Sequence, residues 1–214
     1  FTCDPSFMLK DGAVLLRPGK EKRRGEVDVH RRFYERLGIP IIGEVDASGT
    51  IEGGDCFWVN SSTLAVGKGL RTNDAGISQL RNLVAAEGID VLQFDLPYYK
   101  GPDACLHLMS LVSPLSSDLA IVFEPLLPDG LAGTLKDFGF DLLRAPEKEF
   151  NQSHGLSLNV LATAPREVIA IEGFPETHRL MAEAGCSVSL FDGDELCIPC
   201  EGGPTCLTRP IQRV

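Results

Sequence analysis

The sequence contains no apolar run that approaches the roughly 20 residues needed to span a bilayer, so we expect a soluble protein without a membrane partner. Basic residues are scarce: 20 lysines and arginines face 30 acidic residues, which gives a net charge of -10. This charge would repel a phosphate backbone, so nucleic acid is not an expected partner. A small cation, in contrast, is a suitable ligand.

The chain also lacks the cysteine spacing of a disulfide scaffold. Its seven cysteines are odd in number and irregularly placed, which favours a reducing compartment, and we expect a cytoplasmic protein. With 214 residues, of which 43% are hydrophobic, the chain is large enough to bury a full core. We expect a single globular domain over residues 1–214, and the sequence leaves the oligomeric state open, a homodimer included.

One structural unit recurs four times along the chain. Each copy has a short β-like run, a stretch with apolar residues at helical spacing, a glycine suited to a left-handed helix cap, and a second apolar run. The glycines recur about every 50 residues, a period typical of repeat architectures. The helical stretches and their glycines are 26–37 with Gly38, 73–87 with Gly88, 129–138 with Gly139, and 176–184 with Gly185.

A further segment opens each unit, and these opening segments hold nearly all of the polar residues that suggest a site. They cover residues 1–7, 52–59, 105–112 and 152–161, and a fifth, 203–211, has no helix after it. We therefore expect an incomplete fifth unit. In a closed ring, residues upstream of Phe1 would supply the remainder.

If the opening segments converge on a pseudo-symmetry axis, their polar side chains would face one another across a central pocket. A cysteine there is a strong nucleophile once deprotonated, and a nearby imidazole or a bound guanidinium favours its thiolate form. A carboxylate could orient the imidazole. The residues concerned are Asp4, Glu52, Asp55, His107 and Cys206.

Three motifs carry a family resemblance: EGGD at residues 52–55, HLMS at 107–110 and GGPTCLTRP at 202–210. In this order and spacing they resemble the signatures of the guanidine-modifying superfamily, which holds arginine deiminases, amidinotransferases and dimethylarginine dimethylaminohydrolases. The resemblance extends over essentially the whole chain. It implies an α/β fold, the pentein propeller of five ββαβ units around a pseudo-fivefold axis, with the fifth unit incomplete here.

The resemblance also implies residue roles. Cys206 would attack the guanidinium carbon, His107 would act as general acid and then general base, and Glu52 would hold His107. Asp55 has two open interpretations, because it could pair with the guanidinium or fix the Gly-Gly turn through backbone hydrogen bonds. The partner is a small guanidino substrate. The residues expected to bind it are Asp4, Asp11, Arg23, Asp55 and Arg71.

Neither a metal nor a cofactor is expected. Cys197-Ile198-Pro199-Cys200 has the spacing of a redox or zinc site. Zinc would need further ligands, usually a second Cys or His pair, which the sequence does not clearly provide. We therefore assign no metal to this motif.

The residue after His107-Leu108 distinguishes the branches of the superfamily. Deiminases and amidinotransferases usually carry His-x-Asp, whose aspartate bonds guanidinium nitrogens, whereas this chain has Met109. A dimethylated nitrogen has no N–H to offer, so a carboxylate there would be buried without a partner. We predict a hydrolase that releases citrulline and an alkylamine from N-methylated arginine through a covalent thiouronium. The alternatives are an arginine deiminase or amidinotransferase acting on an unmethylated guanidine, and a non-catalytic pentein binding module.

Overall fold

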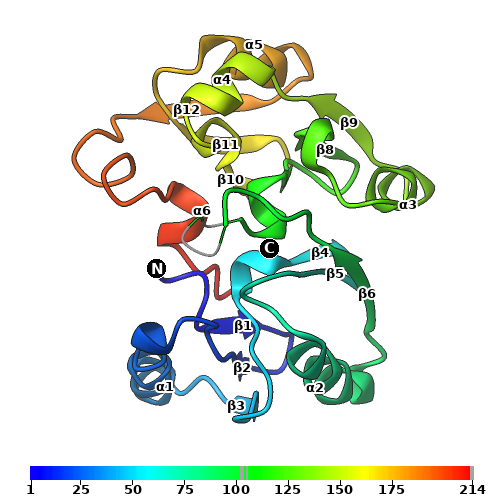
Figure 1. The fold of residues 1–214 in the computed structure, drawn as a ribbon, viewed down its shortest axis with the longest axis vertical. Coiled ribbons are helices and arrows are strands. Elements are labelled where there is room, and N and C mark those ends of the chain that lie inside the picture. Colours follow the sequence, from blue (N-terminus) through cyan, green and yellow to red (C-terminus); the bar gives the residue numbers. More distant parts are fainter. Residues whose placement is uncertain (102–103, 105, 213–214) are drawn as a thin grey trace. The chain divides into compact units, whose positions relative to one another are not determined.

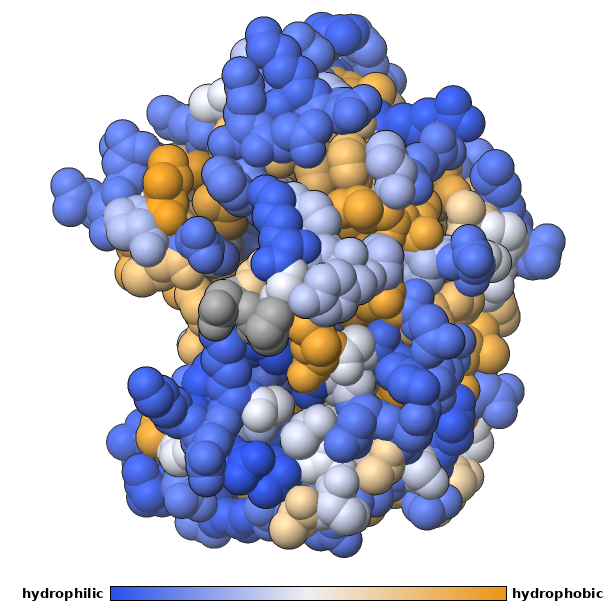
Figure 2. All heavy atoms as spheres, viewed as in Figure 1, coloured by the Kyte–Doolittle hydropathy of each residue, from blue (hydrophilic) through white to orange (hydrophobic). Residues whose placement is uncertain are grey.

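A computed structural model describes residues 1–101, 104 and 106–212 of the chain. They form two compact units, one of Phe1–Leu108 with Arg209–Gln212 and one of Met109–Thr208, and Figure 1 shows the elements of each. In this described part of the chain, no helix is both long and apolar enough to cross a bilayer. On the face drawn in Figure 2, hydrophilic side chains cover most of the surface, with apolar atoms showing between them.

Within the described residues, each unit contains two three-stranded sheets, and all of these sheets share one topology. The first strand pairs antiparallel with the second, and the second pairs parallel with the third. The sheets of the first unit are β1 (Ser6–Met8), β2 (Ala13–Leu15) and β3 (Ile41–Glu44), and β4 (Cys56–Asn60), β5 (Thr63–Lys68) and β6 (Asp90–Asp95). Those of the second are β7 (Val112–Pro114), β8 (Leu119–Val122) and β9 (Asp141–Arg144), and β10 (Leu161–Ala164), β11 (Glu167–Ile171) and β12 (Ser187–Phe191).

A helix connects the second and third strands of each sheet, because a parallel pair needs a crossover instead of a tight turn. These helices are α1 (Glu26–Leu37), α2 (Asp74–Val84), α3 (Leu131–Asp137) and α5 (Pro175–Glu183). Shorter helices are α4 (Glu147–Gln152) and α6 (Pro204–Leu207). Turns of 3-10 helix are η1 (Glu21–Arg23), η2 (Gly53–Asp55), η3 (Ala85–Glu87), η4 (Leu108–Ser110), η5 (Glu124–Leu126) and η6 (Leu156–Leu158).

The four predicted repeats are confirmed, and with them the α/β class. Each predicted glycine has a left-handed backbone, with φ of 68° at Gly38 and Gly88, 88° at Gly139 and 86° at Gly185. Glycine adopts this conformation without a steric penalty, so it ends each crossover helix and turns the chain back into the third strand. The ring of five units stays a prediction.

The core of the first unit packs α2 against strands of both of its sheets. Ile77 and Leu80 of α2 are fully buried among Val14 of β2 and Leu64 and Val66 of β5. The second strand of each sheet is the most buried one, because it pairs on both sides and is covered by the crossover helix.

We expect Leu80→Ala to lower the free energy of unfolding by about 2–5 kcal/mol, because it leaves a cavity beneath α2. Urea denaturation measures this change. Leu70→Ala is the matched control, since Leu70 is 59% exposed and should cost little. Equal losses in the two variants would contradict the assignment of this core.

Candidate active site

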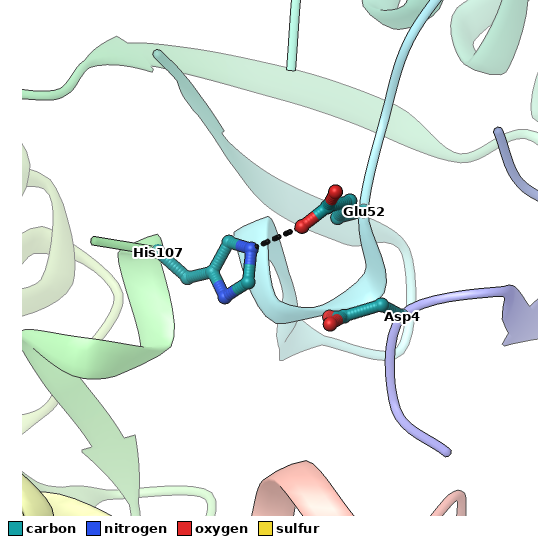
Figure 3. Close-up of side chains that lie close together, drawn as sticks. All are labelled: Asp4, Glu52 and His107. Carbon is teal, nitrogen blue, oxygen red and sulfur yellow. Dashed lines mark hydrogen bonds and ion pairs between the residues drawn. The ribbon is translucent and has the colours of Figure 1, made fainter. Parts of the chain in front are cut away.

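Three buried polar side chains from successive repeats meet in the first unit. Asp4 precedes β1, Glu52 precedes η2 and His107 precedes η4. One oxygen or nitrogen from each lies within 4.8 Å of the others, and Figure 3 shows the side chains pointing toward one another. Each residue belongs to an opening segment, so the repeated topology explains why positions far apart in sequence converge.

His107 and Glu52 form the central hydrogen bond of this cluster. Nε2 of His107 lies 2.6 Å from Oε2 of Glu52, and Oε1 of Glu52 accepts the backbone N–H of Gly19 at 2.9 Å. Burial favours the neutral acid, but the hydrogen bond and charge of His107 outweigh it, so the pKa of Glu52 lies below its ordinary value. An ionised Glu52 requires a proton on Nε2, which makes Nδ1 the nitrogen that could exchange a proton with a reactant.

Asp4 lies beside the imidazole and is held by two donors. Its Oδ1 accepts the N–H of Gly54 at 2.9 Å, and its Oδ2 accepts a hydrogen bond from Arg23 at 2.8 Å. Burial opposes ionisation, but the charge of His107 and the bond from Arg23 outweigh it, so the pKa of Asp4 also lies below its ordinary value. Two ionised carboxylates therefore flank one imidazole.

Two arginines balance these carboxylates. Nη1 of Arg23 lies 3.7 Å from Oε2 of Glu52. The same guanidinium donates two hydrogen bonds to Glu26, from Nε to Oε1 at 2.9 Å and from Nη2 to Oε2 at 2.7 Å. Nη1 of Arg71, itself buried, lies 3.4 Å from Oε1 of Glu52. An unpaired charge in this position would cost several kcal/mol. The arginines explain how Glu52 stays ionised although it is fully buried.

The same three residues, Asp4, Glu52 and His107, could offer ligand atoms to a cation. Both carboxylates already accept hydrogen bonds from the backbone and lie against arginines. A metal ion would have to displace those contacts. The donor set therefore fits hydrogen bonds and ion pairs better than it fits a metal.

Asp55 is fully buried and anchors the backbone beside the histidine. It accepts the hydroxyl of Thr72 at 2.6 Å and the N–H of Leu108 at 3.0 Å. Burial raises the pKa of Asp55 to about 6. Of the two roles left open by the sequence, these contacts favour the backbone role, although the backbone concerned is the one that follows His107 and not the Gly-Gly turn.

Neighbouring groups approach Gly53 and Gly54 so closely that neither position has room for a side chain. A Cβ on Gly54 would lie 2.6 Å from Nδ1 of His107, and a Cβ on Gly53 would overlap the carbonyl of Cys3. A contact under 3.0 Å forces a neighbour to move. The two glycines therefore let the imidazole lie directly against the backbone between Glu52 and Asp55.

Cys206 lies in α6 of the second unit and is half-buried. Nδ2 of Asn159 lies 2.9 Å from its sulfur. In the first unit, burial raises the pKa of Cys3 and raises that of Cys56 well above its ordinary value, so both are neutral thiols. Cys105 lies outside the described residues.

Comparison with known proteins identifies the family. The sequence profile of the arginine deiminase family matches residues 1–139. The chain is 30% identical over 214 residues to the N(G),N(G)-dimethylarginine dimethylaminohydrolase of Streptomyces coelicolor, covering all of this chain and 74% of that protein. The chain belongs to the arginine deiminase family. It is thus a member of the guanidine-modifying pentein superfamily, as the motifs predicted.

Solved structures of this superfamily share the fold. The dimethylarginine dimethylaminohydrolase of Pseudomonas aeruginosa, solved with citrulline, aligns with a TM-score of 0.73 and 24% identity, over 92% of this chain and 70% of that one. An amidinotransferase of saxitoxin biosynthesis from Microseira wollei aligns with a TM-score of 0.81 and 18% identity, over 99% and 69%. At these identities the likeness concerns the fold.

One residue that the superfamily resemblance placed at the site, Asp11, lies outside the cluster of Asp4, Glu52 and His107. Asp11 is exposed in the turn between β1 and β2. The pKa of Glu87 is raised mainly by its own burial, and the negative charge of Asp11 adds to this effect. Asp4 precedes β1 and Asp11 follows it, so the strand separates the two carboxylates. The structure does not bring Asp11 to the cluster.

Three further residues form hydrogen bonds with the site residues but were not among those predicted from the sequence: Gly19, Thr72 and Asn159. Gly19 and Thr72 act on Glu52 and Asp55 through a backbone N–H and a hydroxyl. Asn159 lies in the fourth opening segment, residues 152–161, and the opening segments were expected to hold the site residues. A neutral amide carries no motif of its own, so nothing in the sequence pointed to its contact with Cys206.

The cluster predicts a pH-dependent stability. The folded pKa values of Glu52 and Asp4 lie below their ordinary values, so their stabilising contribution is present above about pH 5 and is lost as the pH falls through the folded pKa values. Glu52→Gln should lower the free energy of unfolding at pH 7 by about 3–5 kcal/mol and flatten the fall of this free energy below about pH 5.

Urea denaturation at several pH values measures both effects, with Glu35→Gln at an exposed position of α1 as the control. An unchanged pH dependence in Glu52→Gln would show that this carboxylate is not stabilised by folding.

Proposed function

We propose that the protein is a cysteine hydrolase of N-methylated arginine, producing citrulline and an alkylamine. The observation that carries the proposal is the buried hydrogen bond between Glu52 and His107 inside an acidic cluster. This arrangement fixes one imidazole nitrogen and orients the ring, as general acid–base chemistry requires. The family to which the chain belongs supports a guanidinium as the group acted on.

In the proposed reaction, the thiolate of Cys206 attacks the guanidinium carbon. The carbon–nitrogen bond to the methylated nitrogen breaks, and His107 protonates the departing alkylamine. A thiouronium then joins the sulfur to the rest of the substrate. His107 takes a proton from water, whose oxygen attacks the same carbon, and citrulline leaves as the thiol re-forms. The net reaction consumes one water molecule.

We assign the remaining predicted residues by charge. Asp4 would attract the cationic end of the substrate, while Arg23 and Arg71 would bind its carboxylate. Each guanidinium has five N–H donors, so each could bind a substrate oxygen in addition to its contacts with the cluster. Asp55 would hold the segment that carries His107, through Leu108.

Met109 and the relatives support a methylated substrate. Met109 follows Leu108 in η4, at the position where the superfamily's deiminases usually carry an aspartate. The relative in Streptomyces coelicolor is named for dimethylarginine, and the one from Pseudomonas aeruginosa was solved with citrulline. The alternative is a deiminase or an amidinotransferase, which the family profile and the Microseira wollei neighbour favour. A non-catalytic binding module is the second alternative.

For the whole chain, we propose one pentein catalytic domain that belongs to a ring of five ββαβ units. The support is the four identical sheet topologies together with the fifth opening segment, which carries Cys206. The cytoplasmic location is likewise a proposal, and its support is the cysteine pattern.

Citrulline formation from asymmetric dimethylarginine and from arginine tests the function. We expect faster turnover of dimethylarginine by the unmodified protein, and a loss of at least about 1000-fold in Cys206→Ser, because a hydroxyl is a far weaker nucleophile at neutral pH. Cys200→Ser is the matched control, since Cys200 is exposed in the same unit.

Each outcome of this assay separates the alternatives. Faster turnover of arginine would favour the deiminase, and full activity in Cys206→Ser would exclude the covalent mechanism. A folded protein that turns over neither compound and is not labelled at Cys206 by a reactive amidine would favour the binding module.

A further inference from the structure

The amide of Asn159, directly after η6, lies against the sulfur of Cys206. Nδ2 lies 2.9 Å from Sγ, and Oδ1 accepts the backbone N–H of Thr205 at 2.9 Å. Because Oδ1 is bound to a backbone donor, the end of the amide that faces the sulfur is the NH2 group. This group can only donate a hydrogen bond.

The surrounding contacts restrict the amide to this orientation. The hydroxyl of Thr205 donates to the carbonyl of Val160 at 2.9 Å. This bond connects the residue before Cys206 to the residue before β10. Gly203 packs against Asn159 so closely that a Cβ would lie 2.7 Å from the Cβ of Asn159. The donor is therefore held on the sulfur by packing and by a second hydrogen bond.

We propose that Asn159 is a positioning residue that orients Cys206 and favours its thiolate form. A neutral thiol accepts hydrogen bonds weakly, whereas an anionic acceptor forms bonds roughly twice as strong. The N–H···S bond thus gains strength when the thiol loses its proton. A second consequence, for turnover, rests on the proposed function. The same N–H donor holds the sulfur in one orientation while it attacks the guanidinium carbon.

A purely structural role would give Asn159 the task of holding Thr205 and nothing more. Asn159→Asp keeps an oxygen for the N–H of Thr205 and replaces the donor to the sulfur by a carboxylate oxygen, whose charge also disfavours the thiolate. Asn159→Ala removes the donor without adding a charge, so a shift in both variants distinguishes loss of the donor from the effect of the added charge. Asn60→Asp is the matched control, because Oδ1 of Asn60 also accepts a backbone N–H, that of Ser62 at 2.9 Å.

The test is the rate of alkylation by iodoacetamide between pH 6 and pH 10, measured for each cysteine by peptide mass spectrometry, with circular dichroism as a check of the fold. At pH 7 we expect Cys206 to react about tenfold more slowly in Asn159→Asp and Asn159→Ala than in the unmodified protein, with the rates converging at high pH. Exposed Cys200 is an internal reference and should react equally in all variants.

An unchanged pH profile of Cys206 in a folded Asn159→Asp variant would overturn the proposal, and Asn159→Ala decides the question if the aspartate variant does not fold. Alkylation needs no substrate. A protein that shows the expected shift but turns over no guanidine would therefore disprove the proposed function and still support the effect of Asn159 on the thiol.

Discussion

The hydrogen bond between Glu52 and His107 is the constraint on which the candidate site depends. A second route ties the same two segments together: the N–H of Glu52 donates to the hydroxyl oxygen of Thr72 at 3.2 Å, and that hydroxyl donates to Asp55. Asp55 in turn accepts the N–H of Leu108. The imidazole and its carboxylate are thus joined both directly and through a chain of buried hydrogen bonds, which fixes the ring against rotation.

The electrostatics of the first unit follow from this arrangement. Glu52 is ionised although it is buried, because Arg23, Arg71 and the imidazole surround it. Asp55 is fully buried, and burial raises its pKa to about 6 although the charge of His107 and the bonds from Thr72 and Leu108 act in the opposite direction. Two acidic residues only three positions apart therefore differ in character, because the bond and charge of His107 outweigh burial at Glu52 and not at Asp55.

Much of the fold could be predicted because the repeat contains local signals. The helix predicted over 26–37 is α1 with the same bounds, since an apolar period and a terminal glycine mark both of its ends. Helix α4 has six residues, too few to show a helical period, and was not predicted. Asp11 was expected at the site from the family resemblance, which does not reveal that β1 lies between it and Asp4 and leaves it exposed. Asn159 was missed because its contact depends on tertiary packing.

The sheet topology also bears on how the chain folds. Every sheet is built from one contiguous stretch, so its strands pair through a local hairpin and a single helical crossover, and the contacts stay local in sequence. Asp4, Glu52 and His107, in contrast, come from three separate stretches and meet only after two sheets have formed. Pairing of the backbone is therefore expected to precede assembly of the polar cluster, and local unfolding of either sheet would dismantle the cluster before the rest of the unit is lost.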